Sequence, residues 1–230
     1  MEIPLPQSLL VEELAAESMV KAVIFDLDGV IIDSLDAHFK AWTEFWRRRG
    51  KKHTRKMFDQ IVATSSEETL RLRNKTFGTR VPIKQGVKER EGLFYNYLDD
   101  VRLYPGAISL LKKLKGKKLG LATSTGARLT DYLFRKYRLG KYFEAVVTKD
   151  NVKHSKPNPA IYLVTAKRLR CKPKDCIVIE DAPNGIKSAK RAGMKVIAVM
   201  QTFGRKHLKG ADLIVPTVRS PEILRFIRKN

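Results

Sequence analysis

The fold is decided by the stretch Lys21-Ala-Val-Ile-Phe-Asp26-Leu-Asp28-Gly29-Val-Ile-Ile-Asp33-Ser34, whose apolar start predicts a buried strand. Because side chains alternate along an extended chain, Asp26 and Asp28 should leave the same side where this strand ends. Two carboxylates that close raise each other's cost of ionisation unless a cation lies between them. A divalent ion such as Mg²⁺ prefers carboxylate and carbonyl oxygens. Gly29 then lets the chain turn where a side chain would obstruct a ligand.

The length and composition of the chain limit its class. With 230 residues, of which 43% are apolar, it can bury a core as one large domain or as a domain with a smaller insertion. No run approaches the roughly twenty apolar residues that span a bilayer, and the N-terminus lacks a signal-peptide pattern. We therefore expect a cytoplasmic protein. Cys171 and Cys176 are expected to be reduced thiols, because no His or Cys lies nearby at zinc-ligand spacing.

The formal net charge is +22, and residues 103–230 hold most of it, with 29 Lys or Arg against 8 Asp or Glu. A positive surface attracts anionic ligands, and it also binds polyanions without sequence preference. The simpler interpretation is a solvated basic face without a partner, because net charge bears on solubility and association before function.

Two segments differ from the rest of the pattern. Residues 1–18 include an amphipathic piece at 8–16, and we interpret them as an N-terminal extension. Residues 37–102 follow the helical period without a strand-like run, which predicts a small helical insertion. Its four expected helices are marked by an aromatic stripe within 38–49, apolar residues at 57–62, capping-box spacing at 65–68 and apolar residues at 87–98.

From Tyr104 onward, helical and strand-like segments alternate. The helix expected first opens at Pro105, a suitable first-turn residue, and ends before Gly116. Such alternation is typical of an α/β fold with a parallel sheet that helices cover on both faces. Ligands of such sheets bind beyond the carboxyl ends of the strands. Short apolar strands are expected at 119–122, 145–147, 177–179, 196–199 and 213–215.

Polar side chains follow the strand that ends at Asp26 and three of the five strands just named. Because parallel strands end at one edge of their sheet, these side chains should all lie at that edge. The first strand ends in Asp26 and Asp28, the second in Thr123-Ser124-Thr125-Gly126, the third leads through Thr148 to Lys156, and the fourth ends in Glu180-Asp181.

These carboxylates suit phosphoryl transfer. A Mg²⁺ ion held by Asp26, Asp181 and the backbone carbonyl of Asp28 would neutralise a phosphate before another carboxylate approaches it. Asp26 could then attack phosphorus to form an aspartyl-phosphate, which splits one hard displacement into two. Asp28 could protonate the leaving oxygen and later deprotonate the attacking water.

The other groups have supporting uses. Thr123 and the amides that follow it would hold the phosphoryl oxygens, and Lys156 would balance the remaining charge. Glu180 is better placed in the second shell of the metal. Each signal alone is common in turns and helix caps, but the set, in this order at successive strand ends, indicates one site.

The four motifs Asp26-Leu-Asp28-Gly-Val-Ile-Ile-Asp-Ser, Leu-Ala-Thr123-Ser, Ser-Lys156-Pro-Asn-Pro and Ile-Glu180-Asp181-Ala-Pro-Asn-Gly resemble those of the haloacid dehalogenase-like hydrolases. The resemblance spans residues 20–216. It implies a Rossmann-like core formed by 19–36 and 103–230, with a helical cap at 37–102, as in the branch of β-phosphoglucomutase and many small-molecule phosphatases. Since the dehalogenase branch lacks an acid at the position of Asp28, this chain resembles the phosphotransfer members.

The same resemblance points to residues that would bind substrate. Ser34, His38 and Trp42 stand where β-phosphoglucomutase-like proteins carry Thr, His and Trp, and we include Ser124 and Ser66 as candidates. Closure of a cap excludes water and brings specificity groups over the phosphate. His38 could couple closure to leaving-group chemistry. A partly buried histidine beside Trp42 without such a role explains it equally well.

One departure bears on the reaction. The mutases carry an arginine after the second cap helix that grips a distal phosphate, whereas residues 63–67 here read Ala-Thr-Ser-Ser-Glu. Arginine is hard to replace in bidentate phosphate binding. We therefore favour a phosphatase over a phosphomutase, although Arg71, Arg73 or Lys75 could substitute. The cap also lacks the Schiff-base lysine expected of a phosphonoacetaldehyde hydrolase.

The basic run of residues 47–56 supports a rival of another class, a nucleic-acid-binding protein on the same scaffold. The run contains no aromatic residue, whereas single-strand binders interleave stacking aromatics with cations. We therefore expect a Mg²⁺-dependent phosphatase that acts on a small phosphorylated metabolite, such as a sugar phosphate. We expect it to be a monomer without a membrane or a dedicated nucleic-acid partner.

Overall fold

The structure, a computed structural model, describes residues 20–62 and 64–230. The N-terminal extension interpreted from residues 1–18 lies outside this range. None of the described helices has the length and apolar content needed to cross a bilayer.

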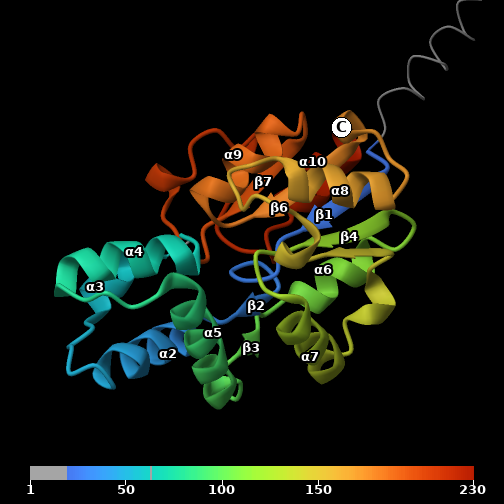
Figure 1. The fold of residues 1–230 in the computed structure, drawn as a ribbon. Coiled ribbons are helices and arrows are strands. Elements are labelled where there is room, and N and C mark those ends of the chain that lie inside the picture. Colours follow the sequence, from blue (N-terminus) through green and yellow to red (C-terminus); the bar gives the residue numbers. More distant parts are fainter. Residues whose placement is uncertain (1–19, 63) are drawn as a thin grey trace, which may run out of the picture.

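Six parallel strands form the central sheet, in the order β5-β4-β1-β6-β7-β8, which confirms the predicted α/β class (Figure 1). The chain runs from the central strand β1 to one edge and then returns to pair β6 on its other side. This return makes a topological switch point between β1 and β6, where ligands of such sheets bind. The strands are β1 (Ala22–Phe25), β4 (Lys118–Ala122), β5 (Ala145–Val147), β6 (Cys176–Glu180), β7 (Lys195–Val199) and β8 (Leu213–Val215).

Helices cover both faces of this sheet because every second residue of a strand points to the same side. In β1, Val23 and Phe25 pack with α6, α7 and α10, whereas Ala22 and Ile24 pack with α8 and α9. The helix expected from Pro105 begins two residues later, because Gly106, at φ +92°, occupies its N-cap. The helices are α6 (Ala107–Lys113), α7 (Ala127–Tyr137), α8 (Ala160–Arg168), α9 (Pro183–Arg191) and α10 (Glu222–Lys229), and the short 3₁₀ turns are η2 (Gly140–Tyr142), η3 (Lys149–Asn151), η4 (Pro173–Asp175) and η5 (Arg205–His207).

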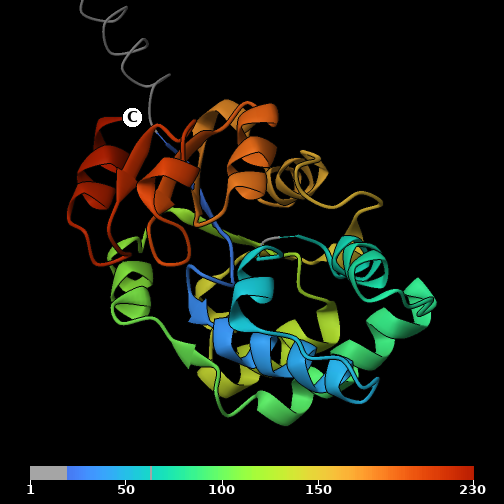
Figure 2. The ribbon, with the colours of Figure 1, turned by 90° about the vertical axis from the view of Figure 1, so that its left-hand side faces the viewer.

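A block of helices lies beyond the carboxyl ends of the strands (Figures 1 and 2). Trp42, Phe45 and Trp46 form a buried stripe on its first helix. The capping box expected at Ser65 is present, with both of its hydrogen bonds, and Glu68 completes it. The block consists of α2 (Leu35–Arg47), α3 (Arg55–Asp59), α4 (Ser66–Phe77), α5 (Ile83–Phe94) and the 3₁₀ turn η1 (Tyr95–Tyr97).

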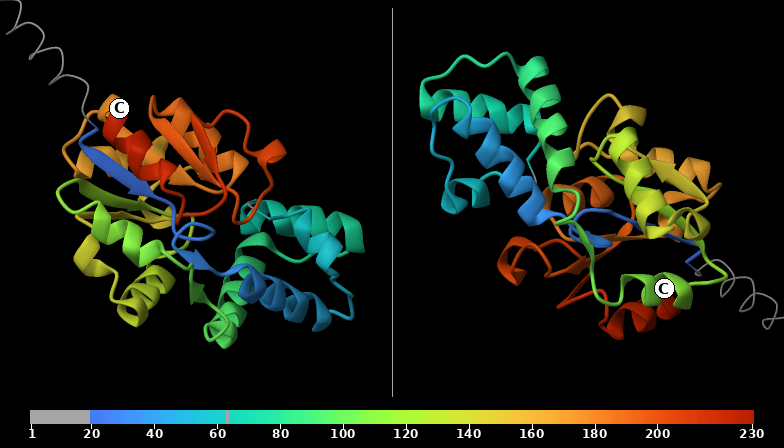
Figure 3. Two further views of the ribbon diagram at one scale, coloured as in Figure 1. Left: turned by 180° about the vertical axis from the view of Figure 1, so that it is seen from behind. Right: turned by 90° about the horizontal axis from the view of Figure 1, so that it is seen from below.

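Two linkers join this block to the sheet, and they lie side by side (Figure 3). The short strands β2 (Ile32–Asp33) and β3 (Arg102–Leu103) pair antiparallel, and the Tyr104 N–H donates to the Ile31 carbonyl at 2.9 Å. The sequence did not predict this ribbon, because strands of two residues show no alternation. It fixes the entry and exit of the helical block at the edge of the sheet where the polar side chains gather.

Candidate active site

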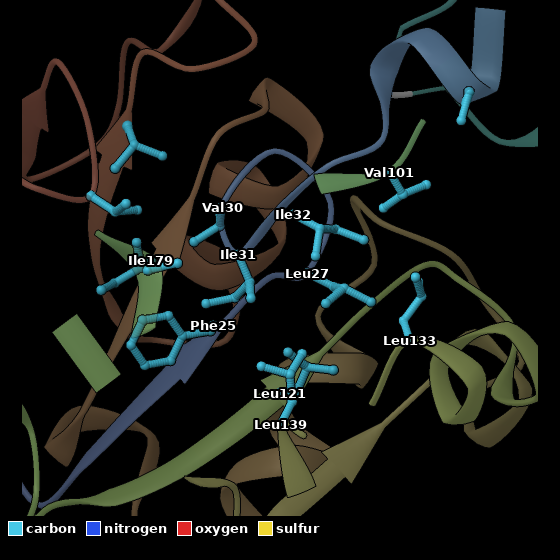
Figure 4. Packing of buried hydrophobic residues seen from close by; sticks show 14 of the residues in the cluster. Phe25, Leu27, Val30, Ile31, Ile32, Val101, Leu121, Leu133, Leu139 and Ile179 are labelled. Carbon is cyan, nitrogen blue, oxygen red and sulfur yellow. The ribbon is translucent and has the colours of Figure 1, made fainter. Parts of the chain in front are cut away.

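The loop after β1 is held by its apolar residues. Leu27, Val30 and Ile31 are fully buried, and Figure 4 shows them in one cluster with Leu121. The Leu27 carbonyl accepts hydrogen bonds from the N–H groups of residues 31 and 32, at 2.9 and 3.0 Å, so the chain turns back on itself at once. The apolar residues therefore anchor the loop. Asp26 and Asp28, on either side of Leu27, line a cavity beyond the strand end.

Two glycines make room for the acids that follow β6. Gly29 has φ +77°, and a Cβ atom built there would lie 1.8 Å from Asp181 Oδ2. A Cβ on Gly185 would lie 1.6 Å from Glu180 Oε1. Neither position can carry a side chain without displacing a carboxylate, so Gly29 lets the loop after β1 approach Asp181, and Gly185 lets the first turn of α9 lie against Glu180.

Lys156 lies at the centre of the acids. Its ammonium donates to Asp26 Oδ1 at 2.9 Å and to Glu180 Oε1 at 2.7 Å, and its side chain is only 8% exposed. Tyr162 donates to the same oxygen of Glu180 at 2.8 Å. The other oxygen of Glu180 accepts the N–H groups of Asp181 and Ala182 at 2.9 and 3.0 Å. Glu180 is thus saturated, and it positions its neighbours.

Positive charge is scarce among these groups. Burial raises the pKa of Asp26 to about 7, and Lys156 only partly opposes the rise, while Glu180 and Asp28 add to it. Burial and the charges of Glu180 and Asp26 also hold the pKa of Asp181 well above its usual range. Asp26, Glu180 and Asp181 thus lie close together beside one lysine ammonium that pairs with only the first two, an arrangement that favours a bound cation.

The donor set fits a divalent cation. Oxygens of Asp26, Glu180 and Asp181 all lie within 4.8 Å of one another. Because Glu180 already accepts four hydrogen bonds, Asp26 and Asp181 are the carboxylates best able to ligate Mg²⁺, with the backbone carbonyl of Asp28 as a further candidate ligand.

Asp28 has a different environment. Ser34 donates to its Oδ1 at 2.5 Å, and Thr125 donates to its Oδ2 at 2.7 Å. Burial raises the pKa of Asp28, but His38 and the two hydroxyls together outweigh burial and lower it to about 2. The two acids of one motif are therefore tuned in opposite directions, a pattern typical of groups with distinct acid–base roles.

His38 links Asp28 to the helical block. Its Nδ1 contacts an Nη atom of Arg90, and since a guanidinium only donates, Nδ1 is the acceptor in this pair. The proton of the neutral imidazole then lies on Nε2, which is 3.7 Å from Asp28 Oδ1. Burial and the Arg90 charge lower the pKa of His38, and Asp28 partly opposes this fall.

The second motif differs in one point from our expectation. Thr123 is fully buried, and its Oγ1 accepts the Thr125 N–H at 3.0 Å rather than lining the cavity. Ser124 and Thr125 line the cavity in its place. Thr123 thus shapes the loop, and the two residues after it face the ligand space.

Residues of the helical block close the other side of the cavity. His38, Trp42 and Ser66 line it, as the candidates for substrate binding should. Arg90 also lines it, and sequence reasoning missed this residue because nothing marks one arginine among many on a helix. Arg71, Arg73 and Lys75 do not line the cavity in the described part of the chain, and Arg73 instead donates to the Met57 carbonyl and to the Gln60 side chain.

Sequence reasoning also missed a pair of residues behind Asp181. Tyr104, which follows β3, and Thr202, which follows β7, both line the cavity. Thr202 lies close enough to the Asp181 carboxyl and the Tyr104 hydroxyl to lower the pKa of both groups, against the rise that burial causes. The linker from the helical block therefore reaches a candidate metal ligand through two side chains.

The cavity has a volume of about 220 Å³, which suits a small metabolite. The family model described as haloacid dehalogenase-like hydrolase matches residues 23–199, a range that contains every motif named above. The chain belongs to the haloacid dehalogenase-like hydrolases.

Relatives of this hydrolase carry two kinds of name. It is 31% identical over 219 residues to a phosphorylated carbohydrates phosphatase of Thermotoga maritima, covering 91% of this chain and 99% of that one. It is 34% identical over 204 residues to a β-phosphoglucomutase of Bacillus subtilis, covering 85% and 89%. The solved β-phosphoglucomutase of Clostridium difficile superposes with a TM-score of 0.79 at 27% identity, covering 92% and 98%. The chain is thus a member of the part of the family that contains sugar-phosphate phosphatases and phosphomutases.

Replacing Lys156 with methionine should lower the free energy of unfolding by about 3 kcal/mol, because two buried carboxylates lose their ammonium partner. Chemical denaturation of Lys156→Met at pH 8 measures the loss. Lys190→Met is the matched control, since Lys190 pairs with Asp212 at the surface, and it should cost less than about 1 kcal/mol. A Lys156 variant as stable as wild type would show that the acids do not need this charge.

Proposed function

We propose that this hydrolase is a Mg²⁺-dependent phosphatase that cleaves a small phosphomonoester, such as a sugar phosphate, through an aspartyl-phosphate at Asp26. The observation that carries the proposal is the contrast between the two acids. Asp26 is paired with Lys156 and belongs to the candidate metal site, whereas Asp28 accepts hydrogen bonds from two hydroxyl groups and faces His38. When bound, Mg²⁺ would supply positive charge to the phosphoryl group. Residues 37–102 would act as a cap over a core formed by 19–36 and 103–230.

In the first half of the reaction, a carboxylate oxygen of Asp26 attacks phosphorus, and the bond from phosphorus to the ester oxygen breaks. Asp28 donates a proton to the departing oxygen, so the product leaves as an alcohol. Asp28 is ionised in this structure, but an approaching phosphate dianion raises its pKa, because like charges repel. Lys156 balances the charge that collects beside Asp26.

In the second half, water attacks the phosphorus of the aspartyl-phosphate, and the bond to Asp26 breaks. Asp28 takes the proton from this water, so Asp28 is again the protonated acid with which the first half began and Asp26 is again a free carboxylate. Ser124 and the amides that follow it would hold the phosphoryl oxygens throughout. The helical block would exclude bulk water during the first half and admit one molecule for the second.

A panel of phosphorylated metabolites tests this proposal. It should include β-glucose 1-phosphate with a bisphosphate activator, because the product then separates the two reactions. We expect free phosphate, the product of a hydrolase. Glucose 6-phosphate as the product would make the chain a phosphomutase instead. For the nucleic-acid rival, tight sequence-dependent binding at physiological salt without phosphate release would overturn the proposal.

A further inference from the structure

The two walls of the cavity differ in charge. The wall formed by the sheet carries the acids and Lys156, as described above. The opposite wall, which we call the α3–α4 wall, consists of α3, α4 and the turn between them. Among the described residues that line the cavity, this wall contributes no charged side chain, and its members are Phe58, Ile61, Val62, Thr64, Ser65, Ser66 and Thr69.

The hydroxyl groups of this wall are oriented by their own hydrogen bonds. Thr64 Oγ1 donates to the Ile61 carbonyl at 2.8 Å, so its single proton is used. The contact of 2.9 Å between the Thr64 and Thr69 hydroxyls must then be donated by Thr69. Thr69 is only 2% exposed, so its place is fixed. Thr69 therefore offers the cavity acceptor lone pairs and no proton.

The two serines add donors to the same wall. Ser65 Oγ accepts the Glu68 N–H at 3.2 Å as the N-cap of α4, which leaves its proton available. Ser66 occupies the first turn of α4 and lines the cavity one residue further along. The wall thus presents donors and acceptors together beside the apolar faces of Phe58, Ile61 and Val62, and this mixture matches the alternating C–H and O–H groups of a polyol.

Arg90 is the remaining Lys or Arg among the described residues that line the cavity, and its guanidinium is engaged by His38 and Trp42. The residue is 5% exposed, its guanidinium contacts His38, and it lies 5.1 Å from the ring centre of Trp42. Because His38 faces Asp28, Arg90 is placed near the reacting phosphate. An anionic group at the α3–α4 wall would therefore lose its hydration without gaining a cationic partner. This loss costs much free energy for a charged group and little for a hydroxyl that finds a hydrogen-bond partner.

Resting on the proposed function, we infer that the substrates are monophosphate esters of uncharged polyhydroxy alcohols, whose hydroxyl chain is bound by the α3–α4 wall. Substrates with a carboxylate or a second phosphate at the far end are rejected by the same wall. This specificity depends on two features of the wall: its hydrogen bonds to the substrate hydroxyls, and its lack of a cation that could pair with an anionic substrate.

A matched pair of substrates tests this inference with the wild-type enzyme. Glucitol 6-phosphate and gluconate 6-phosphate have the same six-carbon chain, and only the second ends in a carboxylate. We expect kcat/KM, measured by phosphate release, to be at least about tenfold higher for glucitol 6-phosphate, which is 1.4 kcal/mol. Equal values, or a preference for gluconate 6-phosphate, would overturn the inference and leave a phosphatase. Release from neither ester, nor from any other monophosphate, would overturn the proposed function as well.

A charge added to the wall should reverse the preference. Ser66→Arg should reduce the ratio of the two kcat/KM values at least fivefold, chiefly by improving gluconate 6-phosphate. Thr76→Arg is the matched control, because Thr76 lies exposed on the same helix and outside the cavity, and it should leave the ratio unchanged. Circular dichroism checks that Ser66→Arg is folded. If the folded variant keeps the wild-type ratio of the two kcat/KM values, the α3–α4 wall does not select substrates by their charge.

Discussion

Substituting asparagine for Asp26 should lower kcat by a factor of about 10⁴ or more, the scale on which nucleophile removal acts in enzymes that form a covalent intermediate. An amide is nearly the same shape as a carboxylate, and its oxygen can still accept the hydrogen bond from Lys156. Lys156 also keeps Glu180 as a charged partner at 2.7 Å. The fold should therefore survive, and the loss should be one of chemistry.

Phosphate release under saturating substrate measures this loss, and a thermal melt of the same preparation checks the fold. Asp99→Asn serves as the matched control, because the Asp99 side chain is fully exposed far along the chain from any motif, and its activity should equal wild type. An Asp26→Asn enzyme that kept more than a tenth of the wild-type kcat would exclude Asp26 as the nucleophile. A melt lowered by ten degrees would instead point to a structural role for the charge.

The parts of the fold that were predicted correctly depend on local patterns. The strands expected at 145–147 and 213–215 have those bounds in the structure, and the other three are longer by one or two residues. A buried strand in a parallel sheet is a short apolar run, and its carboxyl end must reach the edge where its neighbours end. The residues predicted at that edge lie around one cavity for this reason, with Thr123 set behind it.

The parts that were missed depend on contacts between distant segments. Arg90 is one of many basic residues on amphipathic helices, and only the packing of α5 against α2 brings it to His38. Tyr104 and Thr202 are nearly a hundred residues apart, and both lie against the loop after β1, since the Tyr104 N–H donates to the Ile31 carbonyl and the Gln201 side chain donates to the Gly29 carbonyl. Neither pair leaves a periodic signal in the sequence, since the partners share no element.

The charge of the chain and the charge of its site have opposite signs. The whole chain carries +22, whereas four acids, Asp26, Asp28, Glu180 and Asp181, line one cavity together with Lys156. The positive surface raises the local concentration of phosphorylated metabolites, but it does not neutralise these buried acids, and Lys156 pairs with only two of them, Asp26 and Glu180. A phosphate dianion needs a further positive charge there before Asp26 can approach it.

Removal of divalent metal should therefore abolish turnover, and added Mg²⁺ should restore it. The metal-free enzyme holds Asp26 with a pKa of about 7, so this carboxyl is largely protonated at pH 6, and the pKa of Asp181 is raised in the same direction. Protons must leave when a cation binds, and the apparent affinity for Mg²⁺ should fall as the pH is lowered through 7. Chelator-treated enzyme, assayed for phosphate release and titrated with Mg²⁺ in a calorimeter at pH 6 and pH 8, measures both effects.

Substitution of one ligand separates metal binding from catalysis in the same titration. Asp181→Asn should weaken Mg²⁺ binding at least about tenfold, since one of two candidate carboxylate ligands loses its charge. Asp212→Asn removes a surface acid that pairs with Lys190, and it should bind Mg²⁺ as wild type does. Full activity in the presence of excess chelator would mean that Lys156 neutralises the phosphate without a metal ion. Unchanged Mg²⁺ binding by Asp181→Asn would instead exclude Asp181 as a ligand and move the metal site away from these acids.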